Sequence, residues 1–182
     1  MTNPLISFVA FQACWFACVV GASRGLPWLG PVVVLCFATA HLWATPAGQP
    51  RAGQAWLLGL AGLLGYAADS ALVLSGVLSF PPHASLGWPS SAWMVAMWVA
   101  QAATLTGAMS WMAGRYVVGT VFGAVGGPFA YLAGARLGAA ILGPNQTTAL
   151  VVVSVEWAIA MPLLLWIARQ ASPSARRVVV EA

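Results

Sequence analysis

Six long apolar stretches occupy almost the whole chain, and only a few residues separate one from the next. They run over Leu5–Ala22, Leu26–Ala44, Gln54–Phe80, Ala92–Ala113, Tyr116–Leu142 and Thr147–Ala168. A helix rises about 1.5 Å per residue and needs roughly 20 mostly apolar residues to cross the hydrocarbon core of a bilayer. All six stretches approach or exceed that length. The sequence therefore predicts an all-α, polytopic membrane protein with six transmembrane helices in one bundle.

The composition agrees with this class and excludes others. The chain is 61% hydrophobic and 5% charged, whereas soluble domains are about 45–50% apolar and about 25% charged. We expect one transmembrane domain over residues 1–170 and a short basic cytoplasmic tail over residues 171–182. The net charge of +4 does not predict nucleic-acid binding, because the basic residues form no patch.

The arginines predict the orientation of the bundle. Five of them fall on one side of the six-helix thread, namely Arg51, Arg115, Arg169, Arg176 and Arg177, and Arg24 lies alone in a loop on the other side. Cytoplasmic loops carry an excess of basic residues. The sequence therefore predicts that both termini face the cytoplasm.

The tryptophans follow the same threading, because Trp prefers the headgroup level of a bilayer. Trp43, Trp56, Trp111 and Trp166 are expected at the inner ends, and Trp28, Trp88 and Trp93 at the outer ends. Trp15, Trp98 and Trp157 fall deeper in their stretches, where we expect them to pack rather than to anchor.

Three charged residues fall inside the predicted spans. Asp69 lies 11 residues before Phe80, Arg136 lies six before Leu142, and Glu156 lies nine after Thr147. These spacings place all three roughly 9–17 Å from the outer ends. A charge at the bilayer centre costs about 2.5–3.5 kcal/mol on insertion scales, so the sequence predicts a polar cluster in which Arg136 pairs with one of the two acids.

The cluster has an excess of negative charge, so either one carboxyl group is protonated or another cation shares the site. Gln101, near the middle of its span, is expected at the border of the cluster. The plainer reading is an ion pair that clamps helices together and has no part in transport or catalysis.

A stripe of glycines marks the fifth stretch. Gly119, Gly123, Gly127, Gly134 and Gly138 fall within about a 100° arc of a helix. Small residues at such spacings let two helices approach closely, and Pro128 in the middle predicts a kink. The pattern favours helix packing within one subunit and leaves homo-oligomer formation open.

Neither the cysteines nor the histidines predict a cofactor or a metal. Cys14 and Cys18 share a helix face and Cys36 lies in the second stretch, but no CxxC pair or histidine ligand accompanies them. His41 and His83 have no partner that the sequence identifies.

Two segments resemble a known family. They are Phe11-Gln12-Ala13-Cys14-Trp15-Phe16-Ala17-Cys18 and Gly126-Gly127-Pro128-Phe129-Ala130-Tyr131-Leu132-Ala133-Gly134-Ala135-Arg136-Leu137-Gly138-Ala139. They are similar to the domain of unknown function 2878 family of small bacterial inner-membrane proteins. The resemblance extends over nearly the whole chain and implies no assigned activity. The genomic setting of the family implies a link to the modification of membrane phospholipids.

These observations support three functions. The first is an accessory in membrane-lipid modification or handling, whose partners are the bilayer, a phospholipid headgroup that meets Arg136, or a membrane enzyme. The second is a small transporter or proton-coupled permease that titrates Asp69 or Glu156. The third, an intramembrane enzyme, is the weakest, because no nucleophile or metal set is present. A purely structural membrane subunit is the remaining reading.

Overall fold

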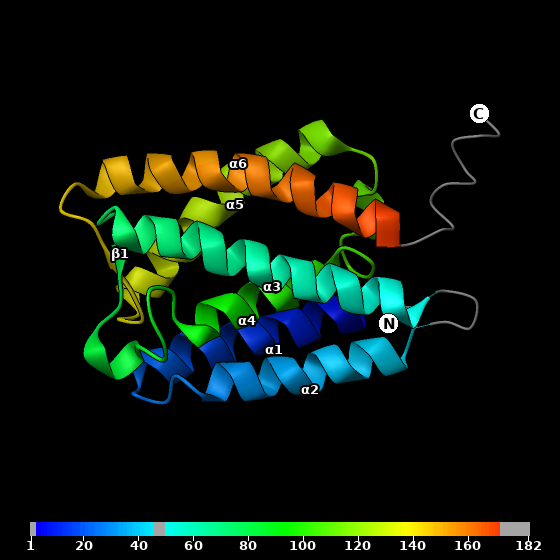
Figure 1. The fold of residues 1–182 in the computed structure, drawn as a ribbon, viewed down its shortest axis with the longest axis horizontal. Coiled ribbons are helices and arrows are strands. Elements are labelled where there is room, and N and C mark those ends of the chain that lie inside the picture. Colours follow the sequence, from blue (N-terminus) through cyan, green and yellow to red (C-terminus); the bar gives the residue numbers. More distant parts are fainter. Residues whose placement is uncertain (1–2, 46–49, 172–182) are drawn as a thin grey trace.

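The computed structural model describes residues 3–45 and 50–171, and helices make up most of this part of the chain (Figure 1). The helices are α1 Pro4–Ser23, α2 Leu29–Trp43, α3 Arg51–Leu74, α4 Ala92–Thr104, α5 Tyr116–Arg136 and α6 Gln146–Ala171, with 3-10 turns η1 Pro82–Ala84 and η2 Ser110–Met112. The predicted basic tail lies outside the described residues from position 172 onward.

The helices form one bundle made of two outer hairpins and a middle layer. α5 packs chiefly against α6, and α1 packs against α2, while α3 and α4 lie between these pairs (Figure 1). α4 contacts α1, α2 and α3, and α3 also contacts α6. α1 begins and α6 ends at the same end of the bundle (Figure 1).

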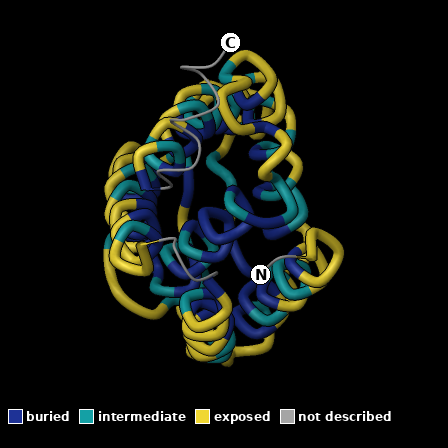
Figure 2. Tube along the Cα trace, turned by 90° about the vertical axis from the view of Figure 1, so that its right-hand side faces the viewer, coloured by how far each residue is buried: buried dark blue, intermediate teal, exposed yellow. Residues whose placement is uncertain are grey.

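Four helices are long and apolar enough to cross a membrane: α1, α3, α5 and α6. Their outward faces carry large apolar side chains that are exposed, while the buried residues face the inside of the bundle (Figure 2). Such a surface is unfavourable in water and favourable in lipid. The structure is therefore that of an all-helical membrane protein.

Two helices are shorter than the apolar stretches that contain them. α2 has 15 residues and α4 has 13, so α4 is about 20 Å long, against about 30 Å for the hydrocarbon core. α4 ends at Thr104 because the amides of Gly107 and Met109 turn back to the Thr104 carbonyl at 2.9 and 2.8 Å. The helix predicted to reach Ala113 is thus replaced in its second half by turns.

Glycines in the left-handed conformation also end two helices earlier than predicted. Gly76 after α3 and Gly138 after α5 have φ angles of 73° and 82°, which favour glycine because it has no Cβ. Beyond them, β1 (Leu78–Ser79) and β2 (Ile141–Leu142) form a two-residue antiparallel pair, with Leu78 opposite Leu142. The ends of the predicted third and fifth spans therefore belong to a small cap on the bundle.

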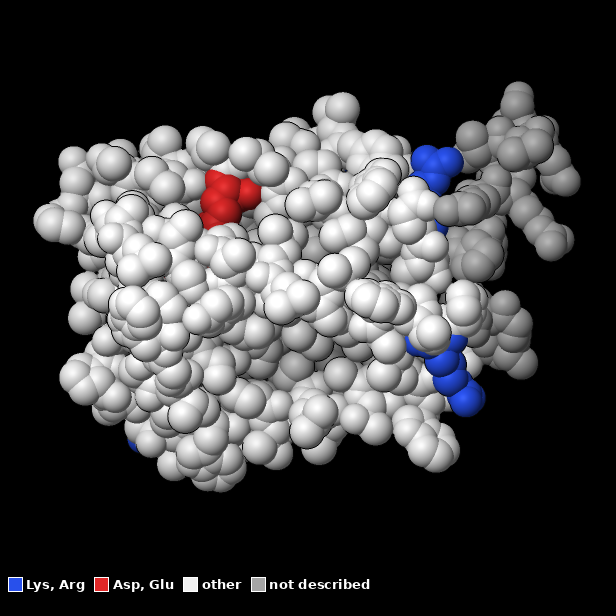
Figure 3. Space-filling model, in the orientation of Figure 1, with Lys and Arg blue, Asp and Glu red and all other residues white. Residues whose placement is uncertain are grey.

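The few charged side chains lie at both ends of the bundle, and an acidic patch is visible away from the arginines (Figure 3). On the face shown in Figure 3, arginine side chains gather where α3 begins and α6 ends, and most of the remaining face is uncharged. Arg51 is exposed in the first turn of α3, and Arg169 lies in the last turn of α6.

The tryptophans separate into exposed and buried groups. Trp43, Trp56, Trp111, Trp166, Trp28 and Trp88 are exposed, whereas Trp98 is buried and Trp15 and Trp157 are partly buried. Trp93 differs from the expectation of an outer anchor. It is buried, and its indole nitrogen donates to the carbonyl of Ala84 at 2.9 Å, so it ties the η1 turn to α4.

Candidate functional site

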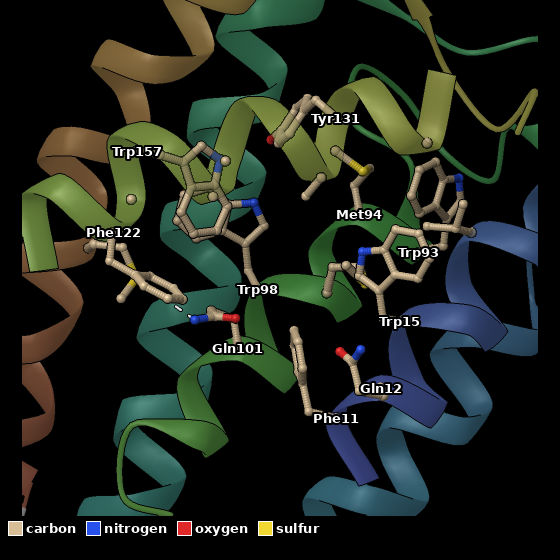
Figure 4. A pocket seen from close by; sticks show the side chains of 18 of the residues that line it. Phe11, Gln12, Trp15, Trp93, Met94, Trp98, Gln101, Phe122, Tyr131 and Trp157 are labelled. Atoms are coloured by element: carbon tan, nitrogen blue, oxygen red, sulfur yellow. Dashed lines mark hydrogen bonds between the residues drawn. The ribbon is translucent and has the colours of Figure 1, made fainter. Parts of the chain in front are cut away.

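A cavity of about 320 Å³ lies between α1, α4, α5 and α6 (Figure 4). α1 packs mainly on α2 and α4, and α5 packs mainly on α6, so these two helices border the cavity from opposite sides. Aromatic side chains form much of its wall: Phe11, Trp15, Trp93, Trp98, Phe122 and Trp157. The size and the lining are those of a small-molecule site, which typically occupies about 300–1,000 Å³.

The cavity reaches the outer surface of the bundle. Phe16 of α1 and Phe122 of α5 both line it, and both are exposed. The methionine side chains of Met94, Met97, Met109 and Met161 complete the apolar wall. Because α1 and α5 expose further large apolar side chains, the cavity opens onto an apolar face of the bundle.

The glycines of α5 give the cavity its shape. Trp157 of α6 stacks on Trp98 of α4 with ring centroids 4.4 Å apart and an angle of 22° between the planes. A Cβ at Gly127 would lie 2.5 Å from Cγ of Trp157, and one at Gly123 would overlap the Trp157 carbonyl oxygen. Because these two positions have no side chain, Trp157 can pack against α5 and form part of the cavity wall.

The full glycine stripe divides into three groups. Gly119, Gly123 and Gly127 face α6, where Gly119 lies against Leu165. A Cβ at Gly134 would meet nothing within 4 Å, and Gly138 lies outside the helix. Gly119, Gly123 and Gly127 therefore allow α5 and α6 to pack closely within one chain. The α5 helix continues through Pro128.

Asp69 lies behind the wall of the cavity and is fully buried. The indole nitrogen of Trp98 donates to its Oδ2 at 2.8 Å, and the Tyr131 hydroxyl donates to its Oδ1. Trp98 and Tyr131 both line the cavity. Asp69 therefore joins α3, α4 and α5 and holds two wall residues in place.

Glu156 of α6 is the second acid of the site. Both of its carboxylate oxygens are buried and have no hydrogen-bond partner in the part of the chain that the structure describes. Glu156 and Asp69 are close enough to interact electrostatically. Ionisable residues inside membrane-spanning segments are rare and often mark ion or proton pathways, so the two acids are candidates for a functional role.

Arg136 does not join the two acids, contrary to the expected ion pair. It is the last residue of α5 and is exposed. The expected depth assumed a helix that runs to Leu142, whereas α5 ends six residues earlier. A cation at this position is stabilised by the carboxyl end of the helix dipole, so Arg136 needs no buried acid.

Gln101 lies in the wall of the cavity. Its amide nitrogen approaches the sulfur atoms of Met109 at 3.3 Å and Met161 at 3.8 Å.

Tyr131 was not among the candidate residues of the sequence analysis. A signal was present, because Tyr131 follows Gly127 by four residues and so lies on the same face of α5.

The remaining candidate groups lie away from the cavity centre. His41 is buried at the end of α2, with its Nε2 3.3 Å from Oε1 of Gln54 and 3.4 Å from the Thr106 hydroxyl. The structure thus gives His41 partners that the sequence did not reveal. In residues 3–45 and 50–171, no group of three His, Cys, Asp or Glu side chains is arranged to hold a metal ion.

A family model described as Protein of unknown function (DUF2878) matches residues 4–163. Searches of curated proteins and of solved structures gave no match. The matched segment extends from the first turn of α1 into α6 and contains both acids, the glycines of α5 and the cavity lining. It covers most of the chain, and this protein belongs to the domain of unknown function 2878 family.

Proposed function

We propose that this protein takes an apolar chain from the surrounding lipid into the cavity between α1 and α5, and so acts as an accessory in membrane-lipid handling or modification. The observation that carries this proposal is the cavity of about 320 Å³ with an aromatic and thioether lining. Because Phe16 and Phe122 are both exposed and part of the lining, a lipid chain enters without crossing water.

The proposal predicts that filling the cavity prevents the entry of lipid. Ala130 of α5 lines the cavity, and Ala130→Trp would place an indole inside it. We expect a phosphatidylglycerol with a photoactivatable group in its acyl chain to label α1 residues 11–16 in the parent protein. Most of this labelling should be lost in Ala130→Trp, as measured by mass spectrometry of the labelled peptides.

Val125→Trp is the matched control, because Val125 lies on the exposed face of the same helix and is not part of the lining. Gln12→Trp fills the cavity from the α1 side and guards against a folding defect specific to α5. Labelling of residues 11–16 that is the same in all four proteins would show that lipid contacts only the outside of the bundle. The chain would then be a structural subunit.

We further propose that all six helices cross the bacterial inner membrane with both termini in the cytoplasm. α1, α3 and α5 start at the end of the bundle where α6 ends, so α2 and α4 must return the chain to that end (Figure 1). The short α4 is mostly buried among its neighbours. Because it faces protein, its length need not equal the thickness of the hydrocarbon core. The arginines gathered at this end support a cytoplasmic position.

The orientation leads to a direct prediction. A fluorescent protein that matures only in the cytoplasm should be bright when it is fused after Ala182. A periplasmic alkaline phosphatase at the same point should be inactive, and the same enzyme inserted beside His83 in the η1 turn should be active. The reverse pattern would invert the proposed topology.

A proton-coupled transporter is the second candidate. It is favoured by the proximity of Asp69 and Glu156 and by the missing hydrogen-bond partners of the Glu156 carboxylate. Neither acid is among the residues that line the cavity, so we place lipid handling first. Proton uptake by proteoliposomes that disappears in Glu156→Gln would reverse this order.

A further inference from the structure

The wall of the cavity is uncharged as far as the described part of the chain forms it. None of these lining residues is Arg, Lys, His, Asp or Glu, and the amide and hydroxyl side chains among them are Gln12, Gln101 and Tyr131. Tyr131 already donates to Asp69. A phosphate or a carboxylate in this space would lose its hydration and find no cation, which is strongly unfavourable. The lining therefore fits an uncharged ligand.

Gln101 offers a hydrogen-bond donor to such a ligand. Its side chain is only 8% exposed, and its amide nitrogen has two methionine sulfurs as its partners in the part of the chain described. Thioether sulfur is a weak acceptor, and a buried amide donor is poorly compensated by it. A carbonyl oxygen would be a better partner for the same N–H group.

Gln12 provides a second amide on the α1 side of the cavity. Figure 4 shows its tip directed into the space between α1 and α4, near Phe11 and Trp15. Within residues 3–45 and 50–171, its amide makes no hydrogen bond. Two amide groups on different helices are thus available in this cavity, together with the indole N–H of Trp157, which is buried without a hydrogen-bond partner among the described residues.

We infer that the cavity binds an uncharged carbonyl group carried on a long apolar chain, and that the Gln101 amide donates a hydrogen bond to the carbonyl oxygen. This inference rests on the proposed uptake of apolar chains and names their chemistry. Carbonyl oxygens of this kind occur in the esters of neutral lipids and in membrane quinones. A phospholipid headgroup would stay outside the cavity, where Arg136 is exposed.

The test measures how well four probes displace the photoactivatable lipid from the purified full chain in detergent. The probes are hexadecane, methyl hexadecanoate, hexadecanoate at pH 8 and decyl-benzoquinone. We expect methyl hexadecanoate or the quinone to displace the label at the lowest concentration, and hexadecanoate to be the weakest. The stronger of the two carbonyl probes identifies an ester lipid or a quinone as the natural source.

Gln101→Leu should weaken the binding of the better carbonyl probe by about three- to tenfold, the range expected for one lost hydrogen bond. The affinity for hexadecane should stay unchanged. Gln146→Leu, at the exposed start of α6, is the matched control and should behave like the parent. If Gln101→Leu does not fold, the ranking of the four probes on the parent protein decides alone.

The outcomes separate this inference from the proposed function. If all four probes displace the label equally, or Gln101→Leu weakens none of them selectively, the carbonyl site is wrong and lipid uptake stands. If hexadecanoate binds best, the neutral-ligand inference is overturned. If no probe displaces the label and the chain runs as a dimer, the groove holds a helix of a second copy, and both proposals fail.

Discussion

Gly123→Ala is expected to destabilise the bundle by about 1–3 kcal/mol, the usual range for overpacking. A Cβ at position 123 would overlap the backbone carbonyl oxygen of Trp157 and approach the Met161 side chain at 2.8 Å. A backbone atom cannot rotate away as a side-chain tip can, so α5 and α6 must separate. The loss should appear as a lower melting temperature in detergent.

Gly126→Ala is the matched control for this effect. A Cβ at Gly126 would meet the Phe122 ring at 3.8 Å, an ordinary van der Waals distance, and alanine is the better helix former. Gly126→Ala should therefore melt at or slightly above the temperature of the parent protein. If both variants melt like the parent, α5 and α6 do not meet at backbone distance.

Asp69→Leu is expected to cost about 2–5 kcal/mol, because it leaves the indole N–H of Trp98 and the hydroxyl of Tyr131 buried without an acceptor. Asp69→Asn should cost much less. Its amide oxygen accepts from Trp98, and its amide nitrogen donates to the Tyr131 oxygen after the hydroxyl rotates. Chemical or thermal unfolding in detergent measures the difference between the two variants.

A second substitution tests the same bonds from the other side. Tyr131→Phe removes the hydroxyl that Asp69→Leu leaves unpaired, so the double variant should lose less stability than the two single losses together. If Asp69→Asn is as damaging as Asp69→Leu, then the shape of the site matters and its hydrogen bonds do not. If Asp69→Leu melts like the parent, Asp69 does not hold the wall of the cavity.

The glycine pattern of α5 was informative in part. Gly119, Gly123 and Gly127 were predicted to pack against another helix, and the structure places them against α6. Helical periodicity brings residues four apart onto one face whatever the partner is. Gly138 fits the same spacing but ends the helix, because periodicity does not distinguish a packing glycine from one with a positive φ.

The charged cluster was the least predictable part. Asp69 is buried inside the bundle, where an acid in an apolar stretch is expected to face protein. The choice of Arg136 as its partner assumed that opposite charges pair. Neutral donors can satisfy a carboxyl group equally well, and Trp98 and Tyr131 are brought to Asp69 only when three helices assemble.

The sequence by itself determined the apolar, all-helical class and the approximate positions of the long helices, because these follow from hydropathy and local helix geometry. Tertiary structure alone decided where α4 breaks, which residues surround Asp69, and that α1 and α5 stand apart far enough to leave a cavity. A cavity is a property of how helices fit together. Residues from four helices create it, and no single segment of the sequence contains it.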